Sequence, residues 1–537
     1  MFKTIINAIL YTQINKSTNS LVMLLNKLTS FISGLICGLS FAPVFFVPGI
    51  FGTSLLVAQI KLSQSRSEAI KYGFMFGFGF YLSSLYWISF ALGVFIDQFW
   101  WAIPFALFGL PAFMAIFTGI IALFAWQMRD NKFFHFFFCF TWVFIEWVIS
   151  WIFTGLPWSV IGYALSNWLI LTQLASIFGI FGLSFIVIYI GSSAYNFLCV
   201  KSDIEKKNFY SRLITSLIII IAMFIYGYLR LKDNPTEYTN ISARLVQPCI
   251  PQTAKWDQKE FWENLDLQIE LSKKEGKPDL IIWSEAALTL PYNIKPVIKK
   301  IQSVFANDEQ ILLTGGVSDN DKTGDDLKIY SSFIGINKSG TKLLDYYKSH
   351  LVPFGEYIPF KNILPLKKIT HGLMDYTEGK RKSVTIEKFD LVTWPLICYE
   401  AIFPYEVKVS NKNADVIINI TNDSWYGNSS GPYQHFEISR MRAIENGLPM
   451  LRIANNGISG FIDPVGRILE KTELNEVTIL DNFIPQKLPL ETLFSKYPLC
   501  GLLLWVYFVL ILQLIGKFCI YILSKQLNQL PRIVEDD

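Results

Sequence analysis

Long apolar stretches alternate with short polar connections in the first part of the chain. No Lys or Arg occurs between Lys71 and Arg129, or between Lys132 and Lys201. Windows of about 20 apolar residues without charges are typical of transmembrane helices. The pattern predicts seven spans before residue 232 and an eighth near the end, at 22–39, 43–60, 72–92, 101–127, 133–154, 168–199, 211–230 and 498–523.

Residues 233–495 differ, because polar and apolar positions mix there in short runs. Strand-like runs alternate with helix-like runs such as 256–275, which predicts a layered α/β domain. The chain is therefore expected to have a membrane domain (1–232), a globular domain (233–495) and a C-terminal helix with its tail (496–537). The strand-like runs are 243–247, 280–283, 311–317, 332–337, 391–398, 415–421 and 450–455.

Basic residues gather in alternate connections between the predicted spans. The connections near Pro43, near Asp97 and at 155–167 contain none. By the positive-inside rule, both termini are predicted to be cytoplasmic, and the 233–495 domain is predicted to lie on the outer face. The basic residues outside that domain that carry this inference are Lys3, Lys16, Lys27, Lys61, Arg66, Lys71, Arg129, Lys132, Lys201, Lys206, Lys207, Arg212, Lys525 and Arg532.

The composition is that of a membrane protein. Of the 537 residues, 52% are hydrophobic and 17% charged, whereas about a quarter of the residues in soluble domains are charged. The net charge of +4 is small and scattered, so nucleic acid is not an expected partner. Seven cysteines without CxxC spacing and four distant histidines argue against a zinc site. Cys249 and Cys398 fall in the polar part and could form one disulfide.

The segment LICYEAIFP, residues 396–404, places Cys398 where a strand-like run ends and a helix-like run begins. A cysteine there is either a small core residue or a nucleophile whose thiol is activated by the amides of a helix start. Glu285 and Lys348 also follow strand-like runs, LIIWSE and LLDYYK. Since strand ends in layered α/β folds collect at one crevice, the three groups are expected to meet.

An acid, a lysine and a thiol can together transfer an acyl group. Glu285 would take the thiol proton as general base, and Cys398 would attack an acyl carbonyl and hold the acyl group as a thioester. Lys348 and the backbone amide of Tyr399 would stabilise the oxyanion. Each residue also has an ordinary interpretation, as a surface glutamate, a solvated lysine or a core cysteine.

Three segments resemble, in the same order, the active-site motifs of the nitrilase (carbon–nitrogen hydrolase) superfamily: WSEAAL, YYKSHLVPFGEYIPF and ICYEAIFP. Combined with the apolar stretches, they make the chain similar to the bacterial apolipoprotein N-acyltransferase family. The resemblance implies an extracytoplasmic αββα sandwich carried by the helical bundle. Further similar stretches are VQPCIPQTAKWD (246–257), FTGLPW (153–158), 419–457 and FIDPVGRI (461–468).

By this resemblance, Glu285 is the base, Lys348 the lysine on the oxyanion side and Cys398 the nucleophile. Glu356, in VPFGEY, resembles the family's second glutamate, which holds the lysine and shapes the pocket. A salt bridge within its loop is the alternative interpretation of Glu356.

Tyr399 and Glu400 follow the nucleophile as they do in the family, and are expected to support the pocket. Trp256 matches the tryptophan of the KWD motif near the lipid entrance, although a large aromatic at a helix start is often packing. His435 can be mistaken for a catalytic base, but a structural role is favoured because Glu285 is available. Further residues expected to be scaffold are Asn422, Trp425, Arg440 and Arg442.

Two positions depart from the family pattern. Ser331 stands where nitrilase-like domains commonly carry asparagine, which could alter hydrogen bonding behind the pocket. Glu146 lies in the fifth predicted span, but Ile149 replaces an arginine that similar proteins often carry a turn later. Because an intramembrane glutamate is costly and usually partnered, Glu146 is open to a structural and a functional interpretation.

The resemblance implies a two-step transfer in the bacterial inner membrane. A phospholipid, with phosphatidylethanolamine as the expected donor, gives its sn-1 acyl chain to Cys398. The acceptor is the α-amine of the diacylglyceryl-cysteine that begins an apolipoprotein. Neither a metal nor an organic cofactor is expected, and the protein is expected to be a monomer. The segment 360–374 suits a lid at the headgroup level or an ordinary insertion.

Two other classes of function remain. A membrane-anchored amidase would use the same three residues to hydrolyse a C–N bond, but one anchor would suffice for it. A transporter with an inactive nitrilase-like domain would explain the helices, but not the presence of Glu285, Lys348 and Cys398 together.

Overall fold

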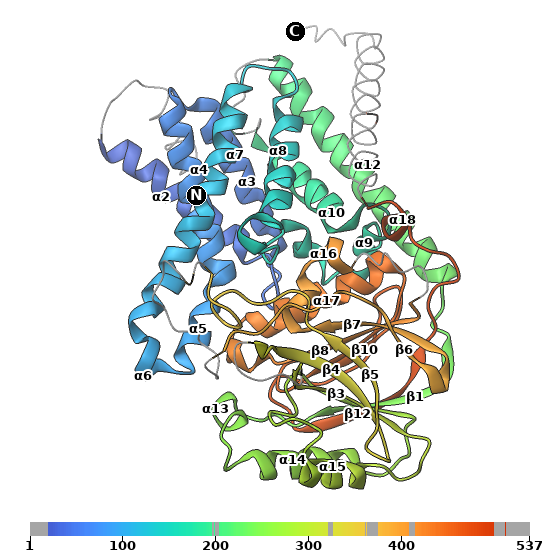
Figure 1. Cartoon of the computed structure of the whole chain (residues 1–537). Coiled ribbons are helices and arrows are strands. Elements are labelled where there is room, and N and C mark those ends of the chain that lie inside the picture. The colour runs from blue at the N-terminus through green and yellow to red at the C-terminus, as the bar shows by residue number, and fades with distance from the viewer. Residues whose placement is uncertain are drawn as a thin grey trace, which may run out of the picture.

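The apolar stretches of the first part of the chain form helices, and the mixed part forms two β-sheets (Figure 1). The predicted eighth span and most of the segment 360–374 lie outside the described residues. The computed structural model describes residues 20–195, 203–320, 326–359, 374–407 and 414–498, with single residues at 198, 361 and 511.

Each of the seven apolar stretches before residue 232 contains an α-helix. Among the residues that the structure describes, three helical segments are long and apolar enough to cross a membrane, namely Phe105–Gln127, Ala175–Ser192 and Lys206–Asp233. The number of eight spans therefore stays a prediction. The helices are α2 (Ser20–Gly38), α3 (Gly52–Leu62), α4 (Arg66–Leu85), α7 (Leu110–Gln127), α8 (Phe134–Ile149), α10 (Ala175–Ser192) and α12 (Asp203–Asp233), with the short α5 (Ile88–Gly93), α6 (Ile96–Phe99) and α9 (Leu169–Thr172) between them.

Regular α-helix is interrupted in several of the predicted spans. The second contains a 3-10 turn, Val47–Phe51, which carries a proline at its start. A short π-helical segment, Phe105–Gly109, precedes α7. Gly179 has a φ of 67° and breaks the regular geometry of α10. Since apolar composition does not encode backbone angles, the hydrophobic pattern could not place these breaks.

Helix α4 lies between α2 and α7 and approaches both closely through glycines. A Cβ at Gly79 would lie 2.1 Å from the carbonyl oxygen of Phe31 in α2. A Cβ at Gly73 would lie 2.5 Å from the Cβ of Ala122 in α7. Small residues let helix backbones approach in this way where lipid offers no hydrophobic driving force.

Glu146 in α8 is buried and accepts three hydrogen bonds from different segments. Trp142 Nε1 and Ile161 N donate to Oε1 over 3.0 and 2.9 Å, and Ser184 Oγ in α10 donates to Oε2. The sequence did not identify a partner for Glu146. In the structure its partners are three neutral hydrogen-bond donors. The carboxylate joins α8, α10 and the loop that leads into 161–165, which favours the structural interpretation of Glu146.

The predicted layered α/β domain is confirmed and consists of two six-stranded sheets. One has the order β12-β1-β2-β3-β4-β5 and the other β11-β10-β9-β8-β7-β6. Strands β1 to β3 are parallel to one another, as are β7 to β9. The strands are β1 (Tyr238–Gln247), β2 (Leu280–Trp283), β3 (Ile311–Asp319), β4 (Ile329–Asn337), β5 (Lys342–Tyr347), β6 (Val384–Ile386), β7 (Leu391–Ile397), β8 (Val416–Thr421), β9 (Met450–Ala454), β10 (Gly460–Ile462), β11 (Ile468–Lys471) and β12 (Thr478–Pro485).

The two sheets pack face to face between helical layers, giving an αββα sandwich. Residues such as Leu245 and Ile282 of the first sheet share one core with Ile418 and Leu451 of the second. The other face of the first sheet is covered by α14 (Phe261–Ser272) and α15 (Lys295–Ile301). The other face of the second sheet is covered by α17 (Gly431–Asn446) and by the short α16 (Pro404–Val407).

The helix-like run predicted at 256–275 begins later than expected. A separate short helix, α13 (Gln252–Lys255), follows Pro251, and Trp256 ends it with non-helical angles before α14 starts at Phe261. The run 256–275 therefore holds one helix, α14, preceded by a turn that follows α13. The remaining helix of the described part is α18 (Leu493–Lys496).

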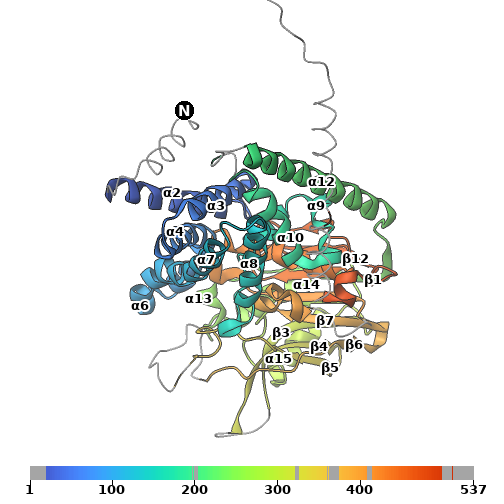
Figure 2. The same ribbon diagram turned by 90° about the horizontal axis from the view of Figure 1, so that it is seen from above.

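Helix α17 joins the sandwich to the helical bundle. Its residues Ile438, Met441 and Ile444 belong to the core of the bundle, as do Ile402 and Phe403 next to β7. Helices α8 and α10 overlie the α/β half when the molecule is viewed from above, with α2, α4 and α7 to one side (Figure 2). The two halves therefore share one continuous core.

A buried ion pair lies at this junction. The Arg442 and Glu445 side chains of α17 are 2.9 Å apart, and Glu445 Oε1 accepts the backbone N–H of Ile180 in α10 over 2.8 Å. Arg442 also donates to the Tyr163 hydroxyl over 3.0 Å. Because these charges face the bundle, α17 is held to it by hydrogen bonds as well as by apolar contact.

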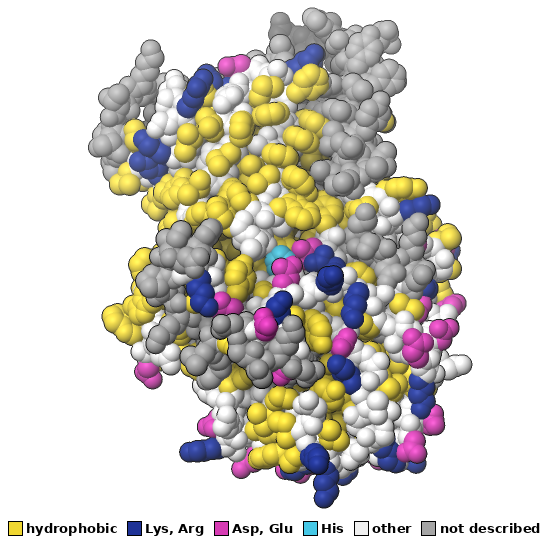
Figure 3. Space-filling model, in the orientation of Figure 1, with side chains coloured by type: hydrophobic (Ala, Val, Ile, Leu, Met, Phe, Trp, Pro, Cys, Tyr) yellow, Lys and Arg dark blue, Asp and Glu magenta, His cyan; other side chains and the backbone are white. Residues whose placement is uncertain are grey.

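Apolar side chains cover much of the surface of the helical half, whereas charged ones are concentrated on the α/β half (Figure 3). The exposed side chains of the helical half include Trp100, Trp101, Phe105, Phe113 and Phe153. Exposed aromatic patches of this kind mark contact with a membrane or another partner.

Replacing Glu146 by alanine should lower the free energy of unfolding by at least about 2 kcal/mol, because three buried donors lose their acceptor. Glutamine is the matched control. Its carbonyl oxygen can keep the two bonds to Trp142 and Ile161, and its amide can donate to Ser184, so Glu146→Gln should cost much less. Thermal unfolding in detergent measures both, and equal stability of the alanine variant and the wild type would contradict this role.

Candidate active site

Glu285, Lys348 and Cys398 come together at one end of the sandwich, as their positions at strand ends predicted. Lys348 directly follows β5 and Glu285 lies two residues beyond β2, both in the first sheet, whereas Cys398 directly follows β7 in the second. All three line one cavity. The site is thus assembled across the interface between the sheets.

Lys348 is buried, with 1% of its surface exposed, and lies between two carboxylates. Its Nζ is 2.8 Å from Glu356 Oε1 and 3.4 Å from Glu285 Oε1. Burial alone would lower the pKa of Lys348, but the charges of Glu356 and Glu285 outweigh it and raise this pKa well above its usual value. The lysine is therefore a permanent cation, held more tightly by Glu356 than by Glu285.

Cys398 has a left-handed backbone, with a φ of +53°, at the first residue of the 3-10 turn 398–402. Residues with a Cβ seldom adopt this conformation unless the surroundings impose it. Burial and the charge of Glu285 raise the pKa of the thiol to about 12, and Lys348 opposes the shift. The resting thiol is therefore protonated and needs a base to become a nucleophile.

Glu285 is placed to be that base. Burial raises the pKa of its carboxyl, which Lys348 counteracts, and a hydrogen bond with the Cys398 side chain also lowers it. A carboxylate with a raised pKa is a stronger base toward the thiol than an exposed one. The pair can thus exchange one proton within the cavity while Lys348 stays charged.

Glu400 is buried and joins the segments that carry Lys348 and Cys398. Its Oε2 accepts the N–H of Ile397 over 2.7 Å. Its Oε1 accepts hydrogen bonds from the Tyr346 hydroxyl, the Ser349 N–H and hydroxyl, and the His350 N–H over 2.7–3.2 Å. Glu400 does not line the cavity. Glu400 therefore supports the pocket indirectly, because it fixes the positions of the segments that carry Lys348 and Cys398.

Tyr399 connects the turn that carries Cys398 to the helical half. Its hydroxyl donates to the carbonyl oxygen of Gly155 over 2.9 Å, and its ring contacts Phe403 edge-on. The residue also lines the cavity. A loop of the bundle therefore contacts the residue adjacent to Cys398.

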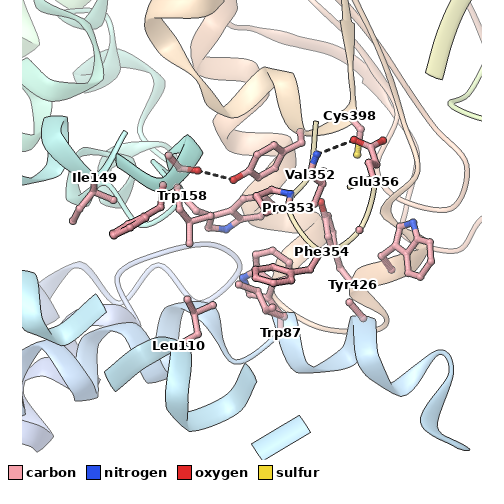
Figure 4. Close-up of a pocket in the computed structure, with 18 of the residues that line it drawn as sticks. Trp87, Leu110, Ile149, Trp158, Val352, Pro353, Phe354, Glu356, Cys398 and Tyr426 are labelled. Carbon is pink, nitrogen blue, oxygen red and sulfur yellow. Dashed lines mark hydrogen bonds between the residues drawn. The ribbon is translucent and has the colours of Figure 1, made fainter. Parts of the chain in front are cut away.

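The cavity has a volume of about 380 Å³ and extends from the reactive groups into the helical half. Cys398 and Glu356 lie at one end of the residues drawn in Figure 4, and Leu110 and Ile149 at the other. Most of its lining is apolar, so it suits a hydrocarbon chain better than a polar ligand. The apolar lining residues include Trp87, Leu110, Phe113, Phe117, Ile149, Leu156, Trp158, Val352, Phe354 and Tyr426.

His435 lies on the backbone side of Cys398 rather than beside its thiol. Its Nε2 donates to the carbonyl oxygen of Cys398 over 3.3 Å, and its Nδ1 is 2.8 Å from Asp423 Oδ1. Arg452 Nη2 is 2.9 Å from the other oxygen of Asp423, and all three side chains are buried. This geometry supports the structural interpretation of His435. Sequence reasoning missed Asp423 and Arg452, which lie inside the family-like segment 419–457.

The other residues that the sequence singled out lie at different places around the site. Trp256 is half-buried at the end of α13 and does not line the cavity. Ser331 is in β4, and its carbonyl oxygen accepts the N–H of Lys348 over 2.8 Å. Cys249 and Cys398 are free thiols, so the disulfide considered above is not formed.

Several further predictions concern the scaffold. Asn422 hydrogen-bonds Gln252 and Asn455, and Arg440 donates to the carbonyl oxygens of Gly466 and Ser166. Trp425 lines the cavity. Within the described ranges, no group of three or more His, Cys, Asp or Glu side chains is arranged to hold a metal ion.

Two family models match the chain. The carbon-nitrogen hydrolase model matches residues 242–487, and the model of the apolipoprotein N-acyltransferase N-terminal domain matches residues 33–193. The apolipoprotein N-acyltransferase of Rickettsia typhi is 52% identical, over 91% of this chain and 97% of the relative. The apolipoprotein N-acyltransferase of Brucella melitensis is 34% identical, over 91% of this chain and 95% of the relative. An amidase structure from Nesterenkonia sp. shares 17% identity and covers 46% of this chain and 92% of its own, with a TM-score of 0.33.

Replacing Glu400 by glutamine should lower the free energy of unfolding by about 2 kcal/mol, since the amide would present N–H groups to the N–H of Ile397. Glu406→Gln is the matched control, because Glu406 pairs with Arg381 and His350 nearer the surface and should matter less. Thermal unfolding in detergent compares the two variants. An equal loss of stability in both variants would contradict the role of Glu400 in holding the two chain segments together.

Proposed function

Because the chain belongs to the apolipoprotein N-acyltransferase family, we propose that it moves an acyl chain from a membrane phospholipid to an apolipoprotein. The acceptor is the N-terminal amine of a diacylglyceryl-cysteine, and phosphatidylethanolamine is the proposed donor. The observation that carries this proposal is the position of Glu285, Lys348 and Cys398 at one end of an apolar cavity lined by both halves of the molecule.

The first step forms a thioester. Glu285 takes the proton of Cys398, and the thiolate attacks the ester carbonyl of the donor. The Lys348 ammonium stabilises the resulting oxyanion, together with the backbone N–H of Tyr399. When the intermediate collapses, the C–O bond breaks, and the lysophospholipid oxygen leaves with the proton that Glu285 had taken.

The second step transfers the acyl group. The neutral α-amine of the acceptor attacks the thioester carbonyl, Glu285 takes a proton from the attacking nitrogen, and the C–S bond breaks. The Cys398 thiolate then regains the proton from Glu285, so that an amide has formed and the enzyme is restored. Water would hydrolyse the same thioester, and the apolar lining of the cavity supports a role in limiting its access.

The proposed setting is the bacterial inner membrane. The membrane domain (1–232) and the C-terminal segment (496–537) carry the spans, the 233–495 domain lies on the outer face, and both termini are cytoplasmic. The alternation of basic connections supports this orientation. The apolar surface of the helical half supports insertion into the bilayer. We propose that the protein acts as a monomer.

A labelled acyl chain should become bound to Cys398 when the purified protein is incubated with labelled phospholipid and no acceptor. Neutral hydroxylamine should release it, and Cys398→Ala should abolish labelling. Glu285→Gln should lower the rate of labelling at least about 100-fold, because the thiol keeps its proton. Mass spectrometry of the labelled peptide locates the acyl group.

Addition of a diacylated lipopeptide should then transfer the label to its amine much faster than buffer releases it. This comparison separates the acyltransferase from a membrane-anchored amidase, which would also form a thioester but release it to water. Release by buffer at the same rate as by the lipopeptide would overturn the proposed acceptor.

A cysteine placed at Ser339, in the exposed turn between β4 and β5, should react with a membrane-impermeant thiol reagent from the outer face of intact cells. The wild-type chain is the control for its own cysteines, of which Cys37, Cys139 and Cys398 are buried. Labelling of Ser339→Cys only after the cells are opened would reverse the proposed orientation.

A further inference from the structure

Lys255 is a buried cation that the mechanism above does not use. It is the last residue of α13, and 4% of its surface is exposed. Its Nζ has no hydrogen-bond partner among the residues that the structure describes. Burying an ammonium without a partner is costly, so its presence requires a compensating interaction.

The position of Lys255 in the fold directs it toward the reaction centre. Helix α13 follows β1, and β1 is the parallel neighbour of β2, which leads into Glu285. Both turns therefore lie at the same edge of the first sheet. Burial lowers the pKa of Lys255 to about 8, and the charges of Glu285 and Cys398 oppose that decrease. Gln252 of the same helix accepts a hydrogen bond from Asn422, which directly follows β8, the parallel neighbour of β7. The buried ammonium is therefore on a helix held at the end of the sandwich where Glu285 and Cys398 lie.

The charges of the site explain why a second cation is useful. Two carboxylates, Glu285 and Glu356, face the single ammonium of Lys348, and Glu356 holds it at 2.8 Å against 3.4 Å for Glu285. With all three charged, one negative charge stays uncompensated in a buried site, which favours protonation of Glu285. A protonated Glu285 cannot accept the thiol proton.

We propose that Lys255 is a positioning residue of the reaction centre, whose positive charge keeps Glu285 ionised and favours the Cys398 thiolate. The groups that act on Glu285 are then Lys348 and Lys255, which stabilise its charge, and Glu356, which opposes it; the thiol of Cys398 is its proton donor. Removing the charge of Lys255 should raise the pKa of Glu285 and of the thiol together. This inference rests on the proposed function, but it can be tested on the reactivity of the Cys398 thiol alone.

The test follows the alkylation of Cys398 by iodoacetamide between pH 5 and 10 in the full-length protein in detergent, read on the Cys398 peptide by mass spectrometry. This reaction requires no phospholipid and no acceptor. Lys255→Met should slow alkylation about tenfold well below pH 8, and the difference from the wild type should shrink as the pH rises past 8, where Lys255 itself loses its charge. Lys255→Arg keeps the charge and should retain most of the wild-type profile.

Lys259→Met is the matched control, because Lys259 is exposed in the same turn and should leave the profile unchanged. Thermal unfolding of each variant reports its folding, and Lys255→Gln replaces Lys255→Met if the latter does not fold. A ratio of wild-type to variant rates that stays the same across the pH range, in the folded neutral variant, would overturn the proposal. A ratio that decreases past pH 8 in a protein that cannot be acylated by phospholipid would instead leave the inference standing and remove the proposed donor.

Discussion

The Glu400 carboxylate holds together the two chain segments on which the active site depends. The segment after β5 carries Lys348, the turn after β7 carries Cys398, and these strands belong to different sheets. Apolar packing fixes the distance between the two sheets. It only weakly fixes how far one sheet slides along the other, since dispersion contacts are not directional. Hydrogen bonds to one charged group are directional, and Glu400 accepts them from both segments. The distances between lysine, glutamates and thiol follow from that constraint.

The junction with the bundle adds a second constraint. The apolar face of α17 and residues 402–403 belong to the core of the helical half, and Tyr399 donates to a carbonyl of a bundle loop. The chemistry therefore lies where the polar domain meets the apolar one. This position suits substrates that stay in a bilayer, because the reacting carbonyl can reach the thiol while its hydrocarbon chain remains among apolar side chains.

The sequence was informative wherever a local pattern determines structure. Continuous apolar runs located β2, β7 and β8 almost to the residue, because parallel strands buried on both faces are apolar along their length. The strands β6, β10, β11 and β12 were missed. β6 and β10 have only three residues each, and β11 and β12 mix apolar with polar and charged positions instead of forming one apolar run. The meeting of Glu285, Lys348 and Cys398 was predicted from their strand ends and from their motifs. Glu400 was expected to support the pocket, but its contacts with Ser349 and Ile397 could not be predicted because they depend on side-chain direction. Lys255 was passed over for the same reason, because a lysine beside a tryptophan in a polar turn resembles any surface lysine.

The shared core around α17 also determines what kind of unit the α/β half is. A soluble enzyme ends in a polar surface on every side, whereas this half exposes Ile438, Met441 and Ile444 as soon as the bundle is removed. Without the bundle, the α/β half would expose an apolar face prone to association, and it would lose the hydrogen bond from Tyr399 to Gly155. The sandwich therefore has the surface of a subunit in an obligate complex rather than that of a tethered domain. Changes in the lipid-facing helices can accordingly alter the catalytic rate without any substitution near the thiol.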